Sequence, residues 1–298
     1  MPQGTCLGPL LFLVYINDLP NISNSFKSIL FADDTTLSLS GNDILSLNSL
    51  CNNEINKFYE WSVANRLTIN TDKTFYNLVT NLPNPNEDAP HLKINSMEIA
   101  RNPSNLFLGV TIDEKFKFNL HISQICKKVS KSIGVLNRLK TSLSSSSMRT
   151  LYFALIYPYL SYCNLIRGNT YITHLNPLIL LQKKAIRIIN NKPFDAHTNE
   201  LFYSSGIIKL MDINKLNLSA FMYKNNLLFM RDSSHNTRNQ NRLLPAFQRL
   251  TISQQSVNYS GPLLWNSIPI SIKESPSLSI FKNRYKKHLI NSYFNDYY

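Results

Sequence analysis

Two adjacent aspartates, Asp33 and Asp34, are the residues of this sequence whose type and spacing point most directly to chemistry. They stand in the stretch ILFADDTTLSLS, between two apolar runs that are typical of strands and that predict a buried hairpin. Adjacent like charges repel, and burial increases the repulsion, so such a pair needs water or a cation. Carboxylate oxygens suit Mg²⁺, which keeps several waters and also binds substrate phosphates. The pair is therefore a candidate metal site, and the competing interpretation is an ordinary exposed turn.

The elements around the pair alternate between helix and strand. The hairpin is predicted to turn at Ala32–Asp34, and Asp43 is suited to cap the helix that follows it. The apolar spacing predicts helices over residues 4–19 and 44–63, and strands over residues 26–32, 35–40, 66–80 and 106–113. A polar, proline-rich loop over residues 81–90 is the best internal boundary of this part.

From His121 onward the apolar residues follow the spacing of helices. One predicted core face consists of Ile122, Ile125, Val129, Ile133 and Leu136. Further helices are predicted over residues 148–168, 174–192 and 214–230, followed by a polar linker over 233–242 and a tail over 256–290. The tail begins with turn residues and ends in a basic amphipathic helix. The predicted fold class is therefore α+β, with the strands in the first part and a mostly helical second part.

Charge is distributed unevenly along the 298 residues, whose formal net charge is +13. Residues 1–114 contain 6 basic and 12 acidic residues, residues 115–192 contain 13 basic and no acidic ones, and residues 193–298 contain 12 and 6. A basic run is usually a solvated surface, but a block of this length without an acid favours a polyanionic partner such as nucleic acid.

The composition argues against a disulfide framework, a zinc site and a membrane span. The 43% hydrophobic content allows a core for one or two domains of roughly 100–200 residues. Cysteines 6, 51, 126 and 163 form no CxxC pair, so neither a disulfide framework nor a zinc site is expected. The apolar run over 151–166 is shorter than the ~20 residues of a membrane span and contains Pro158, so it favours a buried helix. The first residues lack a charged n-region, so an intracellular location, cytoplasmic and nuclear, is expected.

Several motifs in a fixed order carry a resemblance to a known family. PQGTCLGPLLFLVYINDLP and FADDTTL are followed by WSVANRLTINTDKT, LFLGVTID and KVSKSIGVLNRL, and later by YSGPLLWNSIPISIKESPSLSIFKNRYKKHL. This succession resembles the C-terminal palm and thumb portion of non-LTR (LINE-type, jockey-like) retrotransposon reverse transcriptases. The resemblance covers nearly the whole chain. Group II intron maturases share the palm motifs, but the LWNSIP run favours the retrotransposon group.

The resemblance implies an RNA-directed DNA polymerase that uses an RNA template, a DNA primer and deoxynucleotide triphosphates. The implied chemistry is nucleotidyl transfer by two Mg²⁺ or Mn²⁺ ions. Asp33 and Asp34 are implied as catalytic metal ligands, and Lys73 as the acid that protonates the departing pyrophosphate, although an ordinary exposed lysine is an equal alternative. The other implied site residues are Gln3 and Gly4 (template and nucleotide), Phe107, Leu108 and Gly109 (primer grip, with a core strand as the alternative), and Lys127, Lys131, Arg138, Lys183, Lys184 and Arg187 (nucleic-acid backbone). Trp265 is expected to pack in a core.

The resemblance also implies a division of the chain. The implied parts are a partial palm over 1–80, a primer-grip-like segment over 81–118, a basic helical thumb over 119–232, and a linker and C-terminal tail region over 233–298. In the family the third carboxylate and the fingers lie upstream of the PQG loop, at which this sequence starts. We therefore expect a truncated reverse transcriptase that exposes apolar surface and a sheet edge, holds metal weakly, and does not extend a primer by itself.

Two other classes of function stay open. A basic nucleic-acid-binding protein without enzymatic activity would bind RNA or DNA in a salt-dependent way that ignores the aspartates. A helical adaptor for protein partners would show no affinity for polynucleotides. The block over 115–192, which has no acidic residue, argues against the adaptor.

Overall fold

A computed structural model describes residues 5–80, 89–225, 243–245 and 247–295 of the chain. The chain forms two units, of which unit 1 comprises Met1–Asn105 and Asp113–Lys115 and unit 2 comprises Leu106–Ile112 and Phe116–Tyr298. The predicted loop over 81–90 lies mostly outside the described residues, and the predicted linker over 233–242 lies wholly outside them. The mixture of helices with small sheets agrees with the predicted α+β class. The four-part division of the chain stays a prediction.

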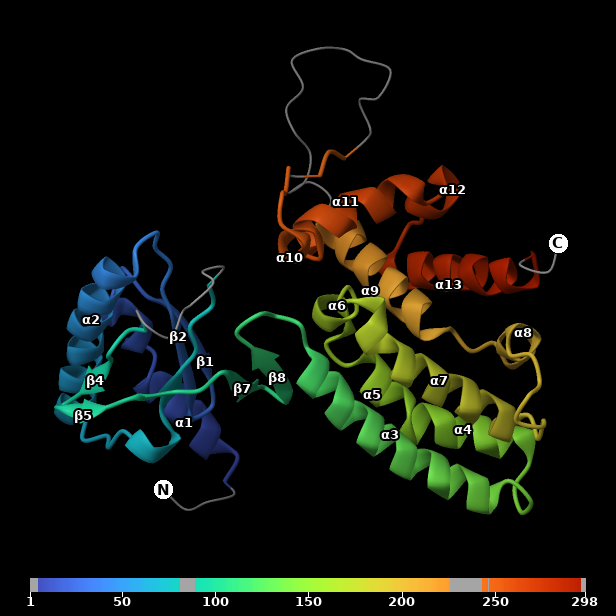
Figure 1. Ribbon diagram of the computed structural model, residues 1–298, viewed down its shortest axis with the longest axis horizontal. Helices are drawn as coiled ribbons and strands as arrows, with labels where there is room; N and C mark the ends of the chain where they lie inside the picture. The colour runs from blue at the N-terminus through green and yellow to red at the C-terminus, as the bar shows by residue number, and fades with distance from the viewer. Residues whose placement is uncertain (1–4, 81–88, 226–242, 246, 296–298) are drawn as a thin grey trace, which may run out of the picture. The chain divides into compact units, whose positions relative to one another are not determined.

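Unit 1 combines short helices with small two-stranded sheets (Figure 1). Its elements are α1 (Leu7–Tyr15), η1 (Leu19–Ile22), β1 (Lys27–Phe31), β2 (Asp34–Ser38), α2 (Ile44–Ala64), η2 (Thr71–Lys73), β3 (Phe75–Tyr76), β4 (Lys93–Ile94), β5 (Met97–Glu98) and β6 (Ala100–Arg101). Strands β1 and β2 pair antiparallel, as do β4 and β5, whereas β3 and β6 pair in parallel. A further hairpin pairs β7 (Ser104–Phe107) with β8 (Val110–Asp113), and its residues Leu106–Ile112 belong to unit 2.

Helix α2 organises the core of unit 1. Its cap is confirmed, because the side chain of Asp43 accepts a hydrogen bond of 2.8 Å from the Ser46 N–H. Ile55 of α2 packs with apolar residues around β4 and β5, and the Asn52 amide joins the helix to that hairpin. It donates 2.9 Å to the His91 carbonyl and accepts 2.9 Å from the Lys93 N–H.

The segment that carries the aspartate pair is far less buried than its apolar sequence predicts. None of the residues in α1 is buried, and Phe31 of β1 is 61% exposed. The prediction of a buried hairpin is therefore wrong for the described residues, because β1 and β2 form a sheet of only these two strands and neither contains a buried residue. The expected exposed apolar surface is present, and in α1 and β1 it includes Leu7, Leu10, Leu11, Leu13, Val14, Ile29 and Phe31.

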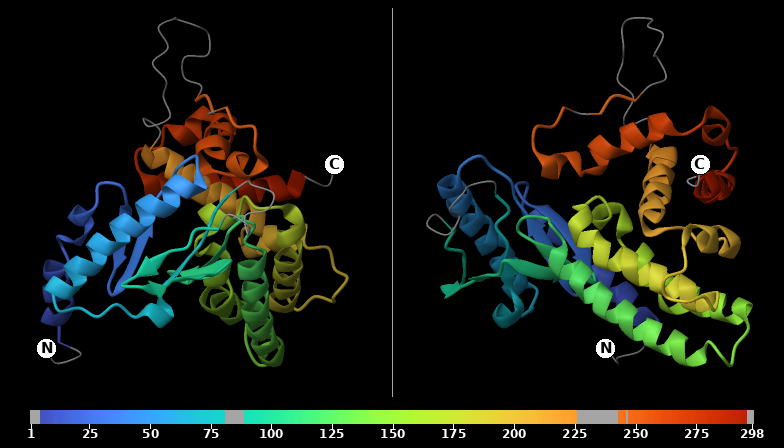
Figure 2. Two further views of the ribbon diagram at one scale, coloured as in Figure 1. Left: turned by 60° about the vertical axis from the view of Figure 1, so that its left-hand side comes forward. Right: turned by 45° about the vertical axis from the view of Figure 1, so that its right-hand side comes forward.

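Unit 2 is a helical assembly in which α3 and α7 lie side by side (Figures 1 and 2). Its helices are α3 (Asn119–Leu139), α4 (Ser145–Leu155), α5 (Tyr157–Ser161), α6 (Asn164–Arg167), α7 (Ile172–Ile189), α8 (Asn199–Ser205), α9 (Leu210–Asn225), α10 (Thr251–Gln254), α11 (Val257–Ser267), α12 (Ile270–Lys273) and α13 (Leu278–Asn295). The predicted core face of the first helix is confirmed, because Ile122, Ile125, Val129, Ile133 and Leu136 are all buried in α3.

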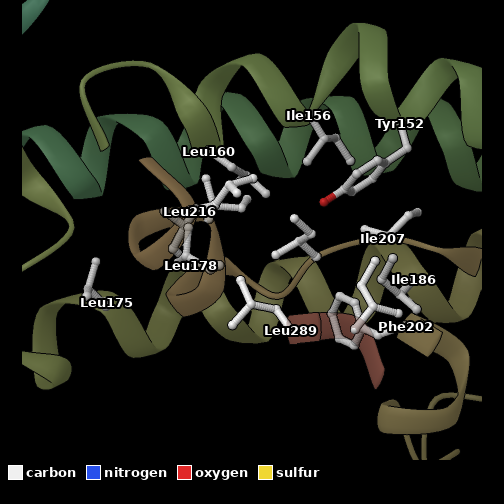
Figure 3. Close-up of a cluster of buried hydrophobic side chains, with 14 of the residues drawn as sticks. Tyr152, Ile156, Leu160, Leu175, Leu178, Ile186, Phe202, Ile207, Leu216 and Leu289 are labelled. Atoms are coloured by element: carbon white, nitrogen blue, oxygen red, sulfur yellow. The ribbon is translucent and has the colours of Figure 1, made fainter. Parts of the chain in front are cut away.

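One large hydrophobic core holds these helices together. Tyr152, Ile156 and Leu160 point from α4 and α5 toward residues of α7 and α9 (Figure 3). The buried amide of Gln182 on α7 donates 2.9 Å to the Tyr152 hydroxyl and 2.9 Å to the Ile208 carbonyl, and it accepts 2.8 Å from the Leu210 N–H. These bonds satisfy polar groups that would otherwise be buried without partners.

A group of aromatic rings from α9, α11 and α13 belongs to the same core. The ring of Trp265 packs against those of Tyr223 and Phe281, with centroids 6.5 Å and 5.8 Å away, so its predicted packing role is confirmed.

Four predicted elements differ from the structure. The single strand over 106–113 is wrong, because the chain turns at Leu108–Gly109 and forms β7 and β8. The strand over 66–80 is wrong except at Phe75–Tyr76, because the Asn70 side chain caps η2 by accepting from the Lys73 N–H at 3.2 Å. The helix over 148–168 is broken into α4, α5 and α6, since Pro158 is tolerated only in the first turn of a helix and here lies in the first turn of α5. The tail forms α11 from residue 257 rather than a turn, whereas its final helix is confirmed as α13.

Candidate functional site

The aspartate pair lies at the tight turn of the β1–β2 hairpin, as its sequence predicts. Phe31 pairs with Asp34, which leaves Ala32 and Asp33 as the two loop residues. Ala32 has a φ of 50°, in the left-handed region that a tight turn requires at this position. Both carboxylates belong to exposed residues. The turn therefore presents two neighbouring carboxylates to solvent, which removes the cost of burying them together.

The aspartate pair offers hard oxygen ligands of the kind that Mg²⁺ or Mn²⁺ prefers. In the part of the chain that the structure describes, no group of three or more His, Cys, Asp or Glu residues could hold a metal ion. The two carboxylates alone therefore make a partial coordination set. They are compatible with an ion that takes its remaining ligands from water and phosphate.

Lys73 lies in η2 and is exposed. Within the described residues, no hydrogen bond or ion pair joins it to Asp33 or Asp34. Gln3 and Gly4, the predicted contacts to template and nucleotide, lie outside the residues that the structure describes.

Phe107, Leu108 and Gly109 form the turn side of the β7–β8 hairpin. Leu108 and Gly109 have φ values of 45° and 81°, which suit a two-residue turn and favour glycine at the second position. The Tyr162 hydroxyl donates a hydrogen bond to the Leu108 carbonyl. The predicted strand-like run is thus a hairpin whose tip is tied to the segment after α5, and its role as a primer grip stays a prediction.

Strand β8 is tied to α3 by hydrogen bonds of Thr111. Its backbone N–H donates to His121 Nδ1 at 3.3 Å, and its hydroxyl donates to Gln124 Oε1 at 3.0 Å. His121 is buried, and its Nε2 has no partner in the described part of the chain. Burial, together with the nearby positive charges of Arg167 and Lys128, lowers the pKa of His121 to about 4. His121 is therefore a neutral acceptor at physiological pH.

Arg167 is a fully buried cation near His121. Its guanidinium donates to the carbonyls of Tyr159 at 2.7 Å, Leu160 at 3.0 Å and Tyr162 at 3.2 Å. Burial lowers the pKa of Arg167 to about 10, so it stays charged. The side chain therefore satisfies the last carbonyls of α5, where the chain leaves the helix.

The predicted backbone-binding residues lie on α3 and α7, which pack against each other. Lys127, Lys131 and Arg138 of α3 are exposed, as is Lys184 of α7. Two residues of α7 are only half-buried, namely Lys183 and Arg187, and the second of these donates from Nε to the Ala196 carbonyl at 2.8 Å. The exposed positions could contact phosphates without losing a protein partner.

Sequence reasoning missed the residues that support these elements, above all Tyr162, Thr111 and Arg167. Each acts through a hydrogen bond to a residue distant in the chain or to a helix end whose position the sequence pattern does not reveal. An arginine in a stretch without acidic residues carries no signal of burial. Only its carbonyl partners identify it as structural.

Comparison with known proteins finds similarity to the same group of proteins as the motifs. Residues 1–112 match the family described as reverse transcriptase (RNA-dependent DNA polymerase). The chain is 26% identical over 222 residues to the RNA-directed DNA polymerase from mobile element jockey of Drosophila melanogaster. The matched region covers 71% of this chain and 24% of that protein.

Two further relatives show the same pattern. The jockey polymerase of Drosophila funebris is 26% identical over 227 residues, 71% of this chain and 24% of that protein. The probable RNA-directed DNA polymerase from transposon X-element of Drosophila melanogaster is 25% identical over 260 residues, 84% of this chain and 27% of that protein. The chain thus spans about a quarter of the length of the curated relatives that it matches.

No solved structure matches the chain significantly. Among the described helices, none combines the length and the apolar character that crossing a membrane requires. The motifs, the matched family and the relatives agree, and they confirm that this chain is similar to the reverse transcriptases of non-LTR, LINE-type retrotransposons.

Proposed function

We propose that this chain is the palm-to-thumb part of an RNA-directed DNA polymerase of a non-LTR retrotransposon. The observation that carries the proposal is the pair of exposed carboxylates at the tight β1–β2 turn, within the residues that match the reverse transcriptase family. In this proposal Asp33 and Asp34 hold Mg²⁺ or Mn²⁺ beside the nucleotide phosphates. The substrates are an RNA template, a DNA primer and deoxynucleotide triphosphates, and the cellular location is cytoplasmic and nuclear.

The remaining predicted roles belong to the same proposal. Lys73 donates the proton to the leaving pyrophosphate, and Gln3 and Gly4 contact template and nucleotide. The β7–β8 turn at Phe107–Gly109 positions the primer end. The exposed lysines and arginine of α3, with those of α7, bind phosphates of the duplex without reading its bases.

We expect the 298-residue chain to hold metal weakly and not to extend a primer by itself. The reason is that the described residues supply only two clustered carboxylates, and catalysis falls steeply when a charge-stabilising group is missing. Mn²⁺ binding, followed by electron paramagnetic resonance, tests the site directly. Weak binding should disappear in the Asp33→Asn/Asp34→Asn double variant. The Glu60→Gln/Asp72→Asn variant, which removes two exposed carboxylates that are not adjacent, should retain it.

Primer extension on an RNA template tests the activity of the chain. Extension by the wild-type chain that is lost in the Asp33→Asn/Asp34→Asn variant would contradict the expected inactivity but support the polymerase assignment. Mn²⁺ binding that is unchanged in the double variant would contradict the metal role of the pair.

A second candidate is a nucleic-acid-binding protein without enzymatic activity, and the block over 115–192 with 13 basic and no acidic residues favours it. This function predicts salt-dependent RNA binding that the aspartate substitutions leave unchanged, with no metal binding at the hairpin. The two candidates are therefore separated by the metal measurement rather than by RNA affinity.

A further inference from the structure

A basic surface lies in unit 2 where α4, α8 and α13 meet, apart from the predicted backbone-binding residues of α3 and α7. Across these three helices the sequence contains five Lys or Arg residues and one acid, Glu200 of α8. Helix α13 packs against α8 (Figure 1), and Arg149 of α4 donates from Nε to the Ser205 carbonyl at 2.8 Å. Arg149 and the basic residues of α13 therefore lie on two helices that both contact α8.

Two of these charges, Arg149 and Lys286, lie on helices that are both joined to α8, the first by the Ser205 hydrogen bond and the second by the packing of α13. The guanidinium of Arg149 is held by Ser205 and by the Phe153 ring, 5.0 Å from the ring centroid. Within the described residues, neither Nη atom of Arg149 donates a hydrogen bond, and Lys286 of α13 forms no ion pair. Burial and the neighbouring Arg149 lower the pKa of Lys286. Two cations that repel each other while keeping donors available are suited to bind an anion.

An exposed aromatic pair lies on the same elements. The rings of Tyr203 on α8 and Phe294 on α13 contact each other at 5.7 Å between centroids. Tyr203 is 42% exposed and Phe294 is 61% exposed, so a large part of each residue's surface is accessible to solvent. Phe294 follows Lys286 by eight residues, so the two share a face of α13.

We propose that Arg149, Lys286, Tyr203 and Phe294 form a binding site for single-stranded nucleic acid, in which the two cations bind phosphates and the aromatic rings stack on unpaired bases. The combination of a basic surface with exposed rings is what single strands require, because every base has a face that can stack. A duplex would use the cations but not the rings. An anionic lipid surface could also use the cations, and the experiment below separates it from RNA.

The test measures binding of a fluorescently labelled, unstructured 12-nucleotide RNA to the full chain by fluorescence anisotropy. EDTA is present and nucleotides are omitted, so the outcome does not depend on the polymerase proposal. Lys286→Gln should weaken binding about tenfold, since it removes one charge-assisted phosphate contact. The slope of log Kd against log salt should fall by ~0.7. Lys287→Gln removes the same charge from the next residue of α13 and should change Kd less than about twofold.

The aromatic half of the site has its own matched pair of variants. Phe294→Ala should weaken binding of the single strand at least about fivefold and leave a duplex of the same sequence unaffected. Phe247→Ala, which removes another highly exposed phenylalanine, should have no effect on either. Both side chains are exposed, so neither variant should unfold the chain.

Three results would overturn the site. The first is equal weakening by Lys286→Gln and Lys287→Gln. The second is a loss of duplex affinity in Phe294→Ala as large as the loss for the single strand. The third is binding of vesicles of phosphatidylserine and phosphatidylcholine that depends on Lys286 and Phe294 while RNA binding does not, which would assign the surface to a membrane instead.

Discussion

Replacing His121 by asparagine should make the stability of unit 2 less sensitive to pH. His121 is buried, and its Nδ1 accepts the hydrogen bond that ties β8 to α3. Asparagine can place its side-chain oxygen near the position of Nδ1, so the acceptor is retained while the titrating group is removed. Because burial and the charges of Arg167 and Lys128 disfavour the imidazolium, the folded protein prefers the neutral ring.

The magnitude follows from the difference between folded and unfolded pKa values. The pKa of His121 is about 4 in the folded chain, against ~6.5 when unfolded. Between these values the unfolded state binds more protons, so the free energy of unfolding falls as the pH falls. Going from pH 7 to pH 5 should cost the wild-type chain about 2 kcal/mol through this residue alone. The His121→Asn variant should not show this loss of unfolding free energy between pH 7 and pH 5.

Urea unfolding followed by tryptophan fluorescence measures the effect in unit 2. The chain has two tryptophans, so a Trp61→Phe background leaves Trp265, which is buried in unit 2, as the reporter. The unfolding free energy is compared at pH 7 and pH 5 for this background and for the same background with His121→Asn. An equal loss of stability in both proteins would refute the assignment of the pH dependence to His121.

Three further variants test the fold. Gln182→Met leaves three buried polar groups without their partner and should destabilise unit 2 by about 3 kcal/mol or more, measured by urea unfolding. Asp43→Ala removes the cap of α2 and should cost ~1 kcal/mol in unit 1, measured by thermal unfolding followed by circular dichroism. Leu10→Lys with Leu13→Lys should reduce binding of the dye ANS and aggregation while changing stability by less than about 0.5 kcal/mol, because both leucines are more than half exposed.

Each of these predictions has an outcome that contradicts it. A loss below about 1 kcal/mol in Gln182→Met would mean that water replaces the amide. Asp43→Ser retains a capping oxygen, so a loss equal to that of Asp43→Ala would exclude capping as the cause. A large loss of stability in the double lysine variant would show that Leu10 and Leu13 pack against other residues.

Local signals in the sequence predicted the elements that depend on a few neighbouring residues. The core face of α3 follows directly from its three-and-four spacing, which places apolar side chains on one side of a helix. The cap at Asp43 and the turn at Ala32–Asp33 need only the backbone groups next to them. The strand predicted over 66–80 failed for the same kind of reason, because the Asn70 side chain offers the backbone a competing hydrogen bond.

The helix predicted over 148–168 shows where local signals end. Its apolar pattern continues through Pro158, yet the chain leaves the helix after α5 and again after α6. The carbonyls freed by the break are satisfied by Arg167, a partner whose burial depends on the surrounding helices. A pattern of apolar residues indicates which side chains favour burial. It does not indicate where the backbone can leave a helix with its carbonyls still hydrogen-bonded.

By itself, the sequence determined the motif order, the adjacent aspartates, the uneven charge and the periodic helix faces, since each depends on residue type and short-range spacing. Only the tertiary structure decided which surfaces are covered. It left α1 and β1 exposed although they are apolar, lowered the pKa of His121 through burial and the charge of Arg167, and joined Arg149 of α4 to the end of α8. The physical reason is that burial and electrostatic interactions depend on groups far apart in the chain, whose distances are set only when the helices pack.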